Sequence, residues 1–224
     1  CHVTMLDCLR DAVVIICNSQ RVNCCILLQL LKDVVTNHAR PAESSRPIGV
    51  FYMNAPSQFT YNLPTTPDRL MAVLTSLEIS FTTHMHPPLR TVEDAKAFRG
   101  DLTGVHIKNL YLRDRKKRNF LLVVEEDKYI DLKALPRRIG SERLSFASVD
   151  RLFEMLGVRP GAVSPFTLIN DPDHKVQLLL DADLAVQPHL FAHPLVNDVT
   201  IGFCGSDLMR FFTYTGHNPR LLVF

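Results

Sequence analysis

The sequence predicts an α+β fold in which helices surround a mixed, mainly antiparallel central sheet. Three observations support this class: short apolar segments of strand length recur from residue 79 to residue 223, capped segments with helical spacing lie between them, and two strand-like segments flank a charged loop. With 224 residues the chain can form one well-packed domain plus an appendage. It contains no GxGxxG or GxxxxGKS element, so nothing supports nucleotide-cofactor chemistry.

Helices are expected where a capping residue precedes apolar residues at helical spacing and a glycine follows them. Thr66-Pro67-Asp68 supplies an N-cap, a first-turn proline and an acid at the positive end of a helix dipole. The predicted helices are 67–78, a short one that Thr91 caps and Gly100 ends, 131–140, 148–157, and one from Ser206 to about Thr215 that Gly216 stops.

Strands are expected where apolar and β-branched residues run or alternate without helical spacing. Segments 105–112 and 120–125 are strongly apolar, and the charged residues 113–119 between them predict an antiparallel hairpin with a basic loop. The other predicted strands are 79–83, 166–169, 176–180, 199–203 and 220–223.

Lys108 is the most informative residue of the 105–112 strand. Alternation places it on one face with His106, Leu110 and Leu112, while Asn109 lies on the other face. Burying an unpaired ammonium is costly, so such a lysine is paired, extends its head to water, or binds an anionic ligand. The strand pattern alone favours the second of these.

Several spaced motifs from residue 54 to residue 224 resemble those of the free-standing prolyl-tRNA deacylases of the YbaK or ProX type, relatives of the editing domain of bacterial prolyl-tRNA synthetase. They occur in the order of that family. The motifs are His86-Pro87-Pro88, Thr91-Val92-Glu93, Lys108-Asn109-Leu110, residues 113–124, Asp131-Leu132-Lys133, Leu144-Ser145-Phe146, residues 157–166, His193-Pro194-Leu195 and residues 208–212.

The resemblance implies the YbaK or synthetase-associated domain fold and a set of site residues. It implies a catalytic role for Lys108 and a supporting polar role for Asn109. It also implies that the loop Gly161-Ala162-Val163-Ser164-Pro165 binds substrate with its backbone amides, and that His193 lines the aminoacyl pocket. Without the resemblance, the loop would equally be an ordinary turn, and His193 an ordinary loop histidine.

The charge distribution suggests where a nucleic acid could bind. The net charge is only +2, but residues 108–159 hold 13 Lys or Arg against 8 Asp or Glu, whereas residues 160–224 hold 3 against 6. The loop residues Arg113, Arg115, Lys116, Lys117 and Arg118 could contact tRNA phosphates, although a solvated hairpin tip explains them slightly better. The loop has no interleaved aromatic residues for base stacking.

The sequence gives little support for a metal site or for a disulfide framework. His84 and His86 could supply half of a metal site, but no third ligand has suitable spacing, so neither a metal nor a cofactor is expected. Only Cys204 lies within the part that resembles the family; the other five cysteines precede residue 26. This thiol-poor domain fits a reducing compartment and predicts a cytoplasmic location.

Residues 1–52 are interpreted as an upstream-translated or non-native extension with a linker, and residues 53–224 as the editing domain. The resemblance begins near Met53, and residues 41–52 are rich in proline, serine and glycine. The apolar runs 12–17 and 24–31 are too short to span a membrane, for which about 20 residues are needed.

The sequence therefore predicts a trans-editing hydrolase that removes a wrong amino acid, alanine above all, from tRNA(Pro) by direct attack of water. No Ser-His-Asp or Cys-His set indicates a covalent intermediate. The alternatives are a deacylase of Cys-tRNA(Pro) or of another small aminoacyl-tRNA, and a non-catalytic tRNA- or aminoacyl-binding module. The expected partners are mischarged tRNA(Pro) and, transiently, prolyl-tRNA synthetase or an elongation factor; a monomer with no membrane partner is expected.

Overall fold

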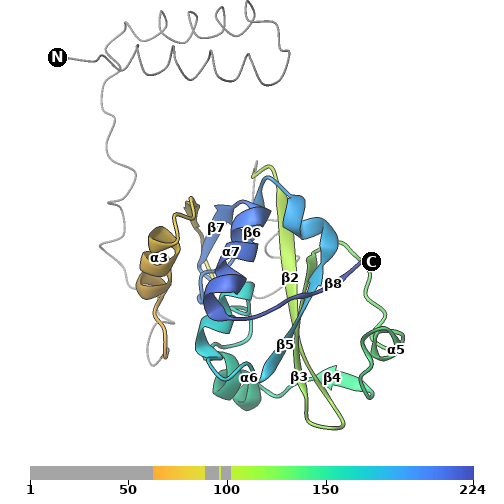
Figure 1. Cartoon of the computed structure of the whole chain (residues 1–224). Helices are drawn as coiled ribbons and strands as arrows, with labels where there is room; N and C mark the ends of the chain where they lie inside the picture. Colours follow the sequence, from red (N-terminus) through yellow and green to blue (C-terminus); the bar gives the residue numbers. More distant parts are fainter. Residues whose placement is uncertain (1–62, 89–95, 97–101) are drawn as a thin grey trace, which may run out of the picture. The chain divides into compact units, whose positions relative to one another are not determined.

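The structure is a computed structural model that describes residues 63–88, 96 and 102–224 (Figure 1). These residues belong to one compact unit, Asn54–Phe224. The extension predicted for residues 1–52 lies outside the described residues. So does the short helix expected between Thr91 and Gly100, except for residue 96.

Two of the helices begin where a side chain caps the first turn. Helix α3, Pro67–Ser76, has Thr66 as its N-cap, whose hydroxyl accepts a hydrogen bond from the backbone N–H of Arg69. Helix α6, Val149–Leu156, begins after Ser148 in the same way and ends at Gly157, which has a left-handed backbone. The other helices are α5 Leu135–Ile139, α7 Gly205–Thr215, and the 3₁₀ helices η1 Pro165–Asn170 and η2 Ala182–Val186.

The described strands form one eight-stranded sheet. Its strands are β1 Thr82–Met85, β2 Val105–Asp114, β3 Asn119–Glu125, β4 Leu144–Phe146, β5 Val176–Asp181, β6 Leu190–Ala192, β7 Val199–Phe203 and β8 Arg220–Leu222. Their order is β1-β7-β6-β2-β3-β5-β8, with β4 also beside β2.

Both antiparallel and parallel pairs occur in this sheet. The pairs β1–β7, β6–β7, β2–β3 and β2–β4 are antiparallel, whereas β2–β6, β3–β5 and β5–β8 are parallel. The predicted α+β class with a mixed, mainly antiparallel sheet is thus confirmed.

The β2–β3 hairpin is confirmed, but its loop is shorter than predicted. Strand β2 continues to Asp114 and β3 already begins at Asn119. The side chain of Asp114 closes the turn, because its Oδ1 accepts from the N–H of Arg118 at 2.9 Å and its Oδ2 accepts from Nε of Arg118 at 2.8 Å. Three residues of the expected loop, Arg113, Asp114 and Asn119, therefore belong to the strands.

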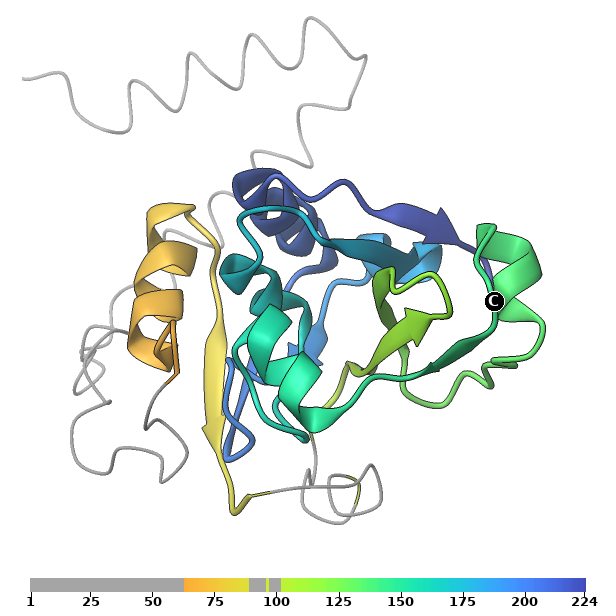
Figure 2. The same cartoon turned by 90° about the horizontal axis from the view of Figure 1, so that it is seen from below.

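Two hydrophobic clusters cover the two faces of β2 and β3. One contains Tyr111, Leu121 and Val123 with residues of α3, α6 and α7; the other contains Leu112, Leu122 and Val124 with residues of α5. Figure 1 and Figure 2 accordingly show α3 and α5 at opposite sides of the sheet. The alternation predicted for residues 105–112 is confirmed by this division.

Several predicted elements were wrong or misplaced. Residues 166–169 form part of the 3₁₀ helix η1, where the Ser164 carbonyl accepts from the N–H and the hydroxyl of Thr167. Strand β1 lies about three residues later than predicted. Helix α5 begins later than residue 131 because the Asp131 carboxylate bonds to the N–H of Lys133 in a local turn. Cys204, rather than Ser206, is the N-cap residue of α7.

In the described part of the chain, no helix combines the length and the apolar character that crossing a bilayer requires.

Close packing at the start of α7 leads to a stability prediction. A Cβ atom at Gly205 would lie 2.1 Å from the carbonyl oxygen of Leu184 in η2. Gly205→Ala should therefore lower the free energy of unfolding by about 1–3 kcal/mol, seen as a lower melting temperature in thermal unfolding. The matched control, Ser206→Ala at the next, exposed position, should change it little. Equal melting temperatures for the two variants would contradict the packing described.

Candidate functional site

Two backbone carbonyls hold the ammonium group of Lys108. Its Nζ donates to the carbonyl oxygen of Glu126 at 2.7 Å and to that of Lys128, both in the segment that follows β3. An ammonium group has three N–H donors, so two are committed. Among the described residues no acceptor binds the third, which leaves a fixed positive charge with one donor available to a ligand.

The segment that holds Lys108 is itself fixed by an ion pair. Nζ of Lys128 lies 2.9 and 2.8 Å from the two carboxylate oxygens of Asp181, which is fully buried, and 2.7 Å from Oδ2 of Asp183. Burial alone would lower the pKa of Lys128, but hydrogen bonds and charge from the two aspartates outweigh this effect and raise that pKa. Lys128 therefore stays charged and ties the segment to the end of β5.

Strands β2 and β6 bring Lys108 and His193 to the same face of the sheet. His106 pairs with Phe191 across these parallel strands, and their rings stack with centroids 4.7 Å apart. Lys108 lies two residues after His106, and His193 lies two residues after Phe191. Alternation places Lys108 on the face of the stacked pair. His193, the first residue after β6, lies near the same face, because its Nδ1 is 3.4 Å from Oγ1 of Thr200, which alternates along β7 with Gly202 opposite Phe191. Lys108 and His193, which were predicted to act together, therefore lie on the same side of the sheet.

Phe191 fits here because the position opposite it has no side chain. Gly202 of β7 pairs with both Phe191 and Thr82. A Cβ atom at Gly202 would lie 2.8 Å from the Phe191 ring and 2.7 Å from Oγ1 of Thr82. The ring therefore lies across β7 and also contacts His84 edge-on, with centroids 5.9 Å apart.

Hydrogen bonds fix the tautomer of His193. Its Nδ1 donates to the carbonyl oxygen of Val199 at 2.7 Å, so in the neutral ring Nε2 is an acceptor. Burial lowers the pKa of His193, and this exceeds the opposing effect of the bond to Val199. The residue therefore presents an uncharged acceptor to the site.

His86 lies beside His193 on this face. Nδ1 of His86 lies 2.9 Å from the carbonyl oxygen of Pro87, and its Nε2 lies 2.9 Å from the hydroxyl of Thr200. With the ring centroids of His86 and His193 5.6 Å apart, these histidines are held by hydrogen bonds within the protein. In the described ranges no three His, Cys, Asp or Glu side chains are grouped to hold a metal ion.

The Asn109 side chain lies on the other face of β2, half-buried, and its Oδ1 has no hydrogen-bond partner within the described part of the chain. It does not contact the Lys108 ammonium, because alternation separates the two side chains. Asn109 therefore lies on the face of β2 that carries the cluster with Tyr111, away from the Lys108 ammonium.

The loop from Gly161 to Pro165 lies on the same face of the sheet as Asn109, against the cluster that contains Tyr111. Pro160 and Gly161, with a φ of +91° at the glycine, form a turn that the N–H of Ala162 closes onto the carbonyl oxygen of Arg159. Ala162 and Val163 then pack in the cluster that contains Tyr111. No described hydrogen bond or ion pair joins this loop to Lys108 or His193.

Two features of the loop fit a role in binding. The Ser164 side chain is fully buried, and its hydroxyl has no hydrogen-bond partner among residues 63–88, 96 and 102–224. In the same ranges, the backbone N–H groups of Val163 and Ser164 bond to no protein acceptor. Unpaired donors of this kind can stabilise a negatively charged oxygen.

The predicted basic loop is partly neutralised within the protein. Arg118 pairs with Asp114 at 2.7 Å, and Lys116 pairs with Glu142 at 3.1 Å. Arg113 lies within β2 and is half-buried, which leaves Arg115 and Lys117 as exposed charges at the tip. The composition of the loop alone overstates its positive charge, because Glu142 comes from a distant part of the sequence.

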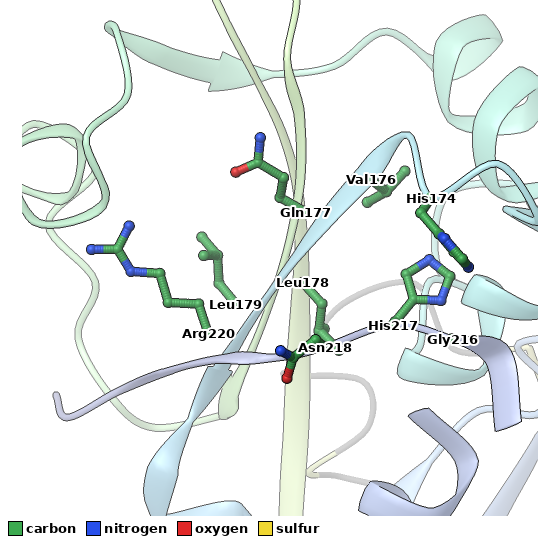
Figure 3. Close-up of a pocket in the computed structure, with 9 residues that line it drawn as sticks. All are labelled: His174, Val176, Gln177, Leu178, Leu179, Gly216, His217, Asn218 and Arg220. Atoms are coloured by element: carbon green, nitrogen blue, oxygen red, sulfur yellow. The ribbon is translucent and has the colours of Figure 1, made fainter. Parts of the chain in front are cut away.

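A pocket of about 260 Å³ lies away from these residues, beside β5 and β8 (Figure 3). His174 and His217 lie next to one another at one end of it, with ring centroids 4.9 Å apart. His217 is buried and its Nε2 lies 3.2 Å from Oδ2 of Asp171, so it connects the start of β5 to the end of α7. None of the predicted site residues lines this pocket.

Three residues that shape the site were not predicted from the sequence: Lys128, Asp181 and Phe191. A signal for Asp181 was available, since an acid directly follows the apolar residues of the predicted strand 176–180 and requires a partner there. Phe191 belongs to a strand of three residues, too short for a recognisable alternation. No local pattern identifies Lys128 as that partner.

The fold and the residues of the site point to one class of protein. The chain belongs to the aminoacyl-tRNA editing domain family, whose model matches residues 86–211. This range includes Lys108, the loop 161–165 and His193.

Individual relatives agree with this assignment. The chain is 37% identical to the prolyl-tRNA editing protein ProX of Acetoanaerobium sticklandii over 154 residues, which are 68% of this chain and 94% of that protein. It is 39% identical to the prolyl-tRNA synthetase associated domain-containing protein 1 of Danio rerio over 153 residues, 67% of this chain and 83% of that protein.

A solved structure shows the same fold. It is that of a proposed trans-editing enzyme for prolyl tRNA synthetase, with a TM-score of 0.54 and 22% sequence identity. The similarity covers 70% of this chain and 96% of that one.

The Lys128 ion pair leads to a stability prediction. Lys128→Met would leave the Asp181 carboxylate buried without its cation, so the free energy of unfolding should fall by about 3–5 kcal/mol in urea titrations. Lys175→Met is the matched control, because Lys175 forms an exposed ion pair with Asp173, and exposed pairs contribute little to stability. A loss no larger than that of the control would show that the buried pair does not stabilise the fold.

The environment of His193 leads to a titration prediction. Because its pKa is lowered from 6.5, the folded state binds fewer protons here than the unfolded state. The resulting stability is present above pH 6.5 and is lost as the pH falls through the lowered pKa. NMR should show the His193 ring titrating below pH 6.5, with a protonated Nδ1 in its neutral form; the spectrum of His193→Gln assigns the signal. A midpoint above 6.5, or an Nε2-protonated neutral ring, would contradict this.

Proposed function

We propose that this protein is a trans-editing hydrolase that deacylates mischarged tRNA(Pro), with Ala-tRNA(Pro) as its substrate. The observation that carries the proposal is the Lys108 ammonium, fixed by two carbonyls with one donor uncommitted, on the same sheet face as the neutral His193. Membership of the aminoacyl-tRNA editing family and similarity to a prolyl-tRNA editing protein support the same reaction class.

The fixed charge of Lys108 suits an anchoring role. The 3′ end of an aminoacyl-tRNA offers phosphate oxygens next to the ester that is to be cleaved, and a charge-assisted hydrogen bond to one of them would position the ester. Because carbonyls already orient the ammonium, little conformational freedom is lost on binding.

Hydrolysis then requires a nucleophile and a site for the oxyanion. A water oxygen forms a bond to the ester carbonyl carbon, and collapse of the tetrahedral intermediate breaks the bond to the terminal ribose oxygen, which takes up a proton. The 2′-hydroxyl of that ribose is the proposed proton acceptor: it takes the proton from the water and passes its own proton to the departing ribose oxygen. The unpaired amides of Val163 and Ser164, in the loop that begins at Gly161, are the proposed oxyanion donors. Because this loop packs on the sheet face opposite Lys108, the proposal requires that substrate binding bring the loop and Lys108 to the same ester.

The choice of alanine rests on the size of the pocket that this role requires. A pocket that accepts a methyl side chain can exclude the larger proline ring, so the correctly charged tRNA is spared. The acceptor nitrogen of His193 is suited to receive a hydrogen bond from the α-ammonium group of the substrate. Cysteine or another small amino acid would meet the same two requirements and is the alternative substrate.

A non-catalytic module that binds tRNA or aminoacyl groups is the second candidate. It is favoured by one observation, the carbonyl-bonded Lys108, which can hold a phosphate without taking part in any chemistry. Under either function we expect a monomer that meets prolyl-tRNA synthetase or an elongation factor only transiently.

Hydrolysis assays with the full chain test the proposal. Ala-tRNA(Pro) should be deacylated and Pro-tRNA(Pro) spared. Lys108→Ala should lower the rate by roughly 100- to 1,000-fold, as the loss of one electrostatic contact to the transition state does. Lys133→Ala, at an exposed lysine, is the matched control and should keep full activity.

The other outcomes separate the alternatives. Hydrolysis of Cys-tRNA(Pro) in preference to Ala-tRNA(Pro) would identify the alternative substrate. Binding of tRNA without hydrolysis of any ester would establish the binding module. Unchanged hydrolysis by Lys108→Ala would refute the role of that lysine, and inhibition by EDTA would point to a metal hydrolase using His84 and His86.

A further inference from the structure

We propose that Tyr129 forms a subsite for the unpaired 3′ nucleotides of the tRNA, where its ring stacks on a base while Lys108 holds a neighbouring phosphate. This inference rests on the proposed function in requiring a tRNA substrate. It adds a base-binding residue that neither the motifs nor the basic hairpin contains.

Tyr129 is the most exposed of the large hydrophobic side chains in the described ranges, with 87% of its surface accessible. None of the ring contacts described for the protein involves it. An isolated exposed aromatic residue is common on protein surfaces and needs no explanation by itself. The position of Tyr129 relative to Lys108 distinguishes it from such residues.

One peptide bond joins Tyr129 to the site. The carbonyl that accepts from Lys108 Nζ is that of Lys128, and the same planar peptide continues to Cα of Tyr129. The Lys108 ammonium and this Cα are therefore about 6 Å apart or less. A nucleotide whose phosphate meets the ammonium has its base within reach of a tyrosine ring at that distance.

The backbone beneath Tyr129 is held in place. The N–H of Glu126 donates to the carbonyl oxygen of His106 at 2.9 Å, and the N–H of Lys128 donates to that of Glu125 at 3.2 Å. The Lys128 side chain is held by Asp181 and Asp183. Tyrosine has only two side-chain torsions to fix, so a ring presented from this segment loses little entropy when a base stacks on it.

The chemistry of the Tyr129 subsite indicates which ligand it would bind. An aromatic face next to a fixed ammonium binds a flexible, unstacked nucleotide better than a base-paired one, because only the former exposes the face of its base. The single-stranded 3′ end of a tRNA, which carries the ester, is such a segment. Paired acceptor-stem bases are not available for this contact.

Binding measurements with the full chain at one fixed salt concentration test the inference. The probes are an acceptor-stem RNA hairpin with its single-stranded 3′ CCA end and the same hairpin with a blunt end. Tyr129→Ala should weaken binding of the CCA hairpin by roughly 5- to 150-fold and leave binding of the blunt hairpin unchanged. Tyr129→Phe should bind both as the unmodified protein does, because it keeps the ring.

Tyr214→Ala is the matched control, since Tyr214 is also exposed but lies on α7. Equal binding of the CCA hairpin by Tyr129→Ala and the unmodified protein would overturn the inference and leave the proposed function intact. Equal weakening of both hairpins would also overturn it. If the unmodified protein bound neither hairpin and hydrolysed no aminoacyl-tRNA, the proposed function would fail together with the inference.

Discussion

Strand β2 is the constraint on which the arrangement of the molecule depends. Its ten residues pair with β3, β4 and β6, so it belongs to both the antiparallel and the parallel parts of the sheet. Side chains alternate along it without interruption. Tyr111 therefore contributes to one core cluster and Leu112 to the other, and in the middle of the strand the same alternation separates Asn109 from Lys108.

The contacts of Lys108 show how a half-buried ammonium can be stabilised without a large desolvation cost. Two neutral carbonyl dipoles hold the ammonium, and no carboxylate of the described residues is in hydrogen-bond contact with it. A carboxylate would neutralise the charge and compete with an anionic ligand. Carbonyls stabilise the ammonium but carry no net charge, so the site keeps a positive charge that can attract an anion. The carboxylate of Asp181 acts one step away, on Lys128.

Much of the fold could be predicted from local sequence. The caps at Thr66 and Ser148 and the glycines 157 and 216 define helix ends through contacts within a few residues, and these predictions were confirmed. The strand predicted at 166–169 was wrong because Pro165 and the carbonyl of Ser164 favour a tight 3₁₀ turn, which a short apolar run does not reveal.

The candidate site could be predicted only in part. The motifs singled out Lys108 and His193, but the contacts that orient them come from elsewhere in the chain. These contacts are made by the backbone carbonyls of Val199, Glu126 and Lys128. Every residue type has such a carbonyl, so the sequence does not identify them. The pairing of β2 with β6 joins segments about 85 residues apart, which no local pattern specifies.

The contact between Phe191 and the bare backbone at Gly202 has a consequence for the history of this protein. Any side chain at position 202 would occupy the space that the ring fills, and a smaller residue at 191 would leave β7 uncovered. Neither substitution is favourable without the other. The two positions should therefore covary among sequences of this type, with glycine at one accompanying an aromatic residue at the other, as a record of selection acting on the pair.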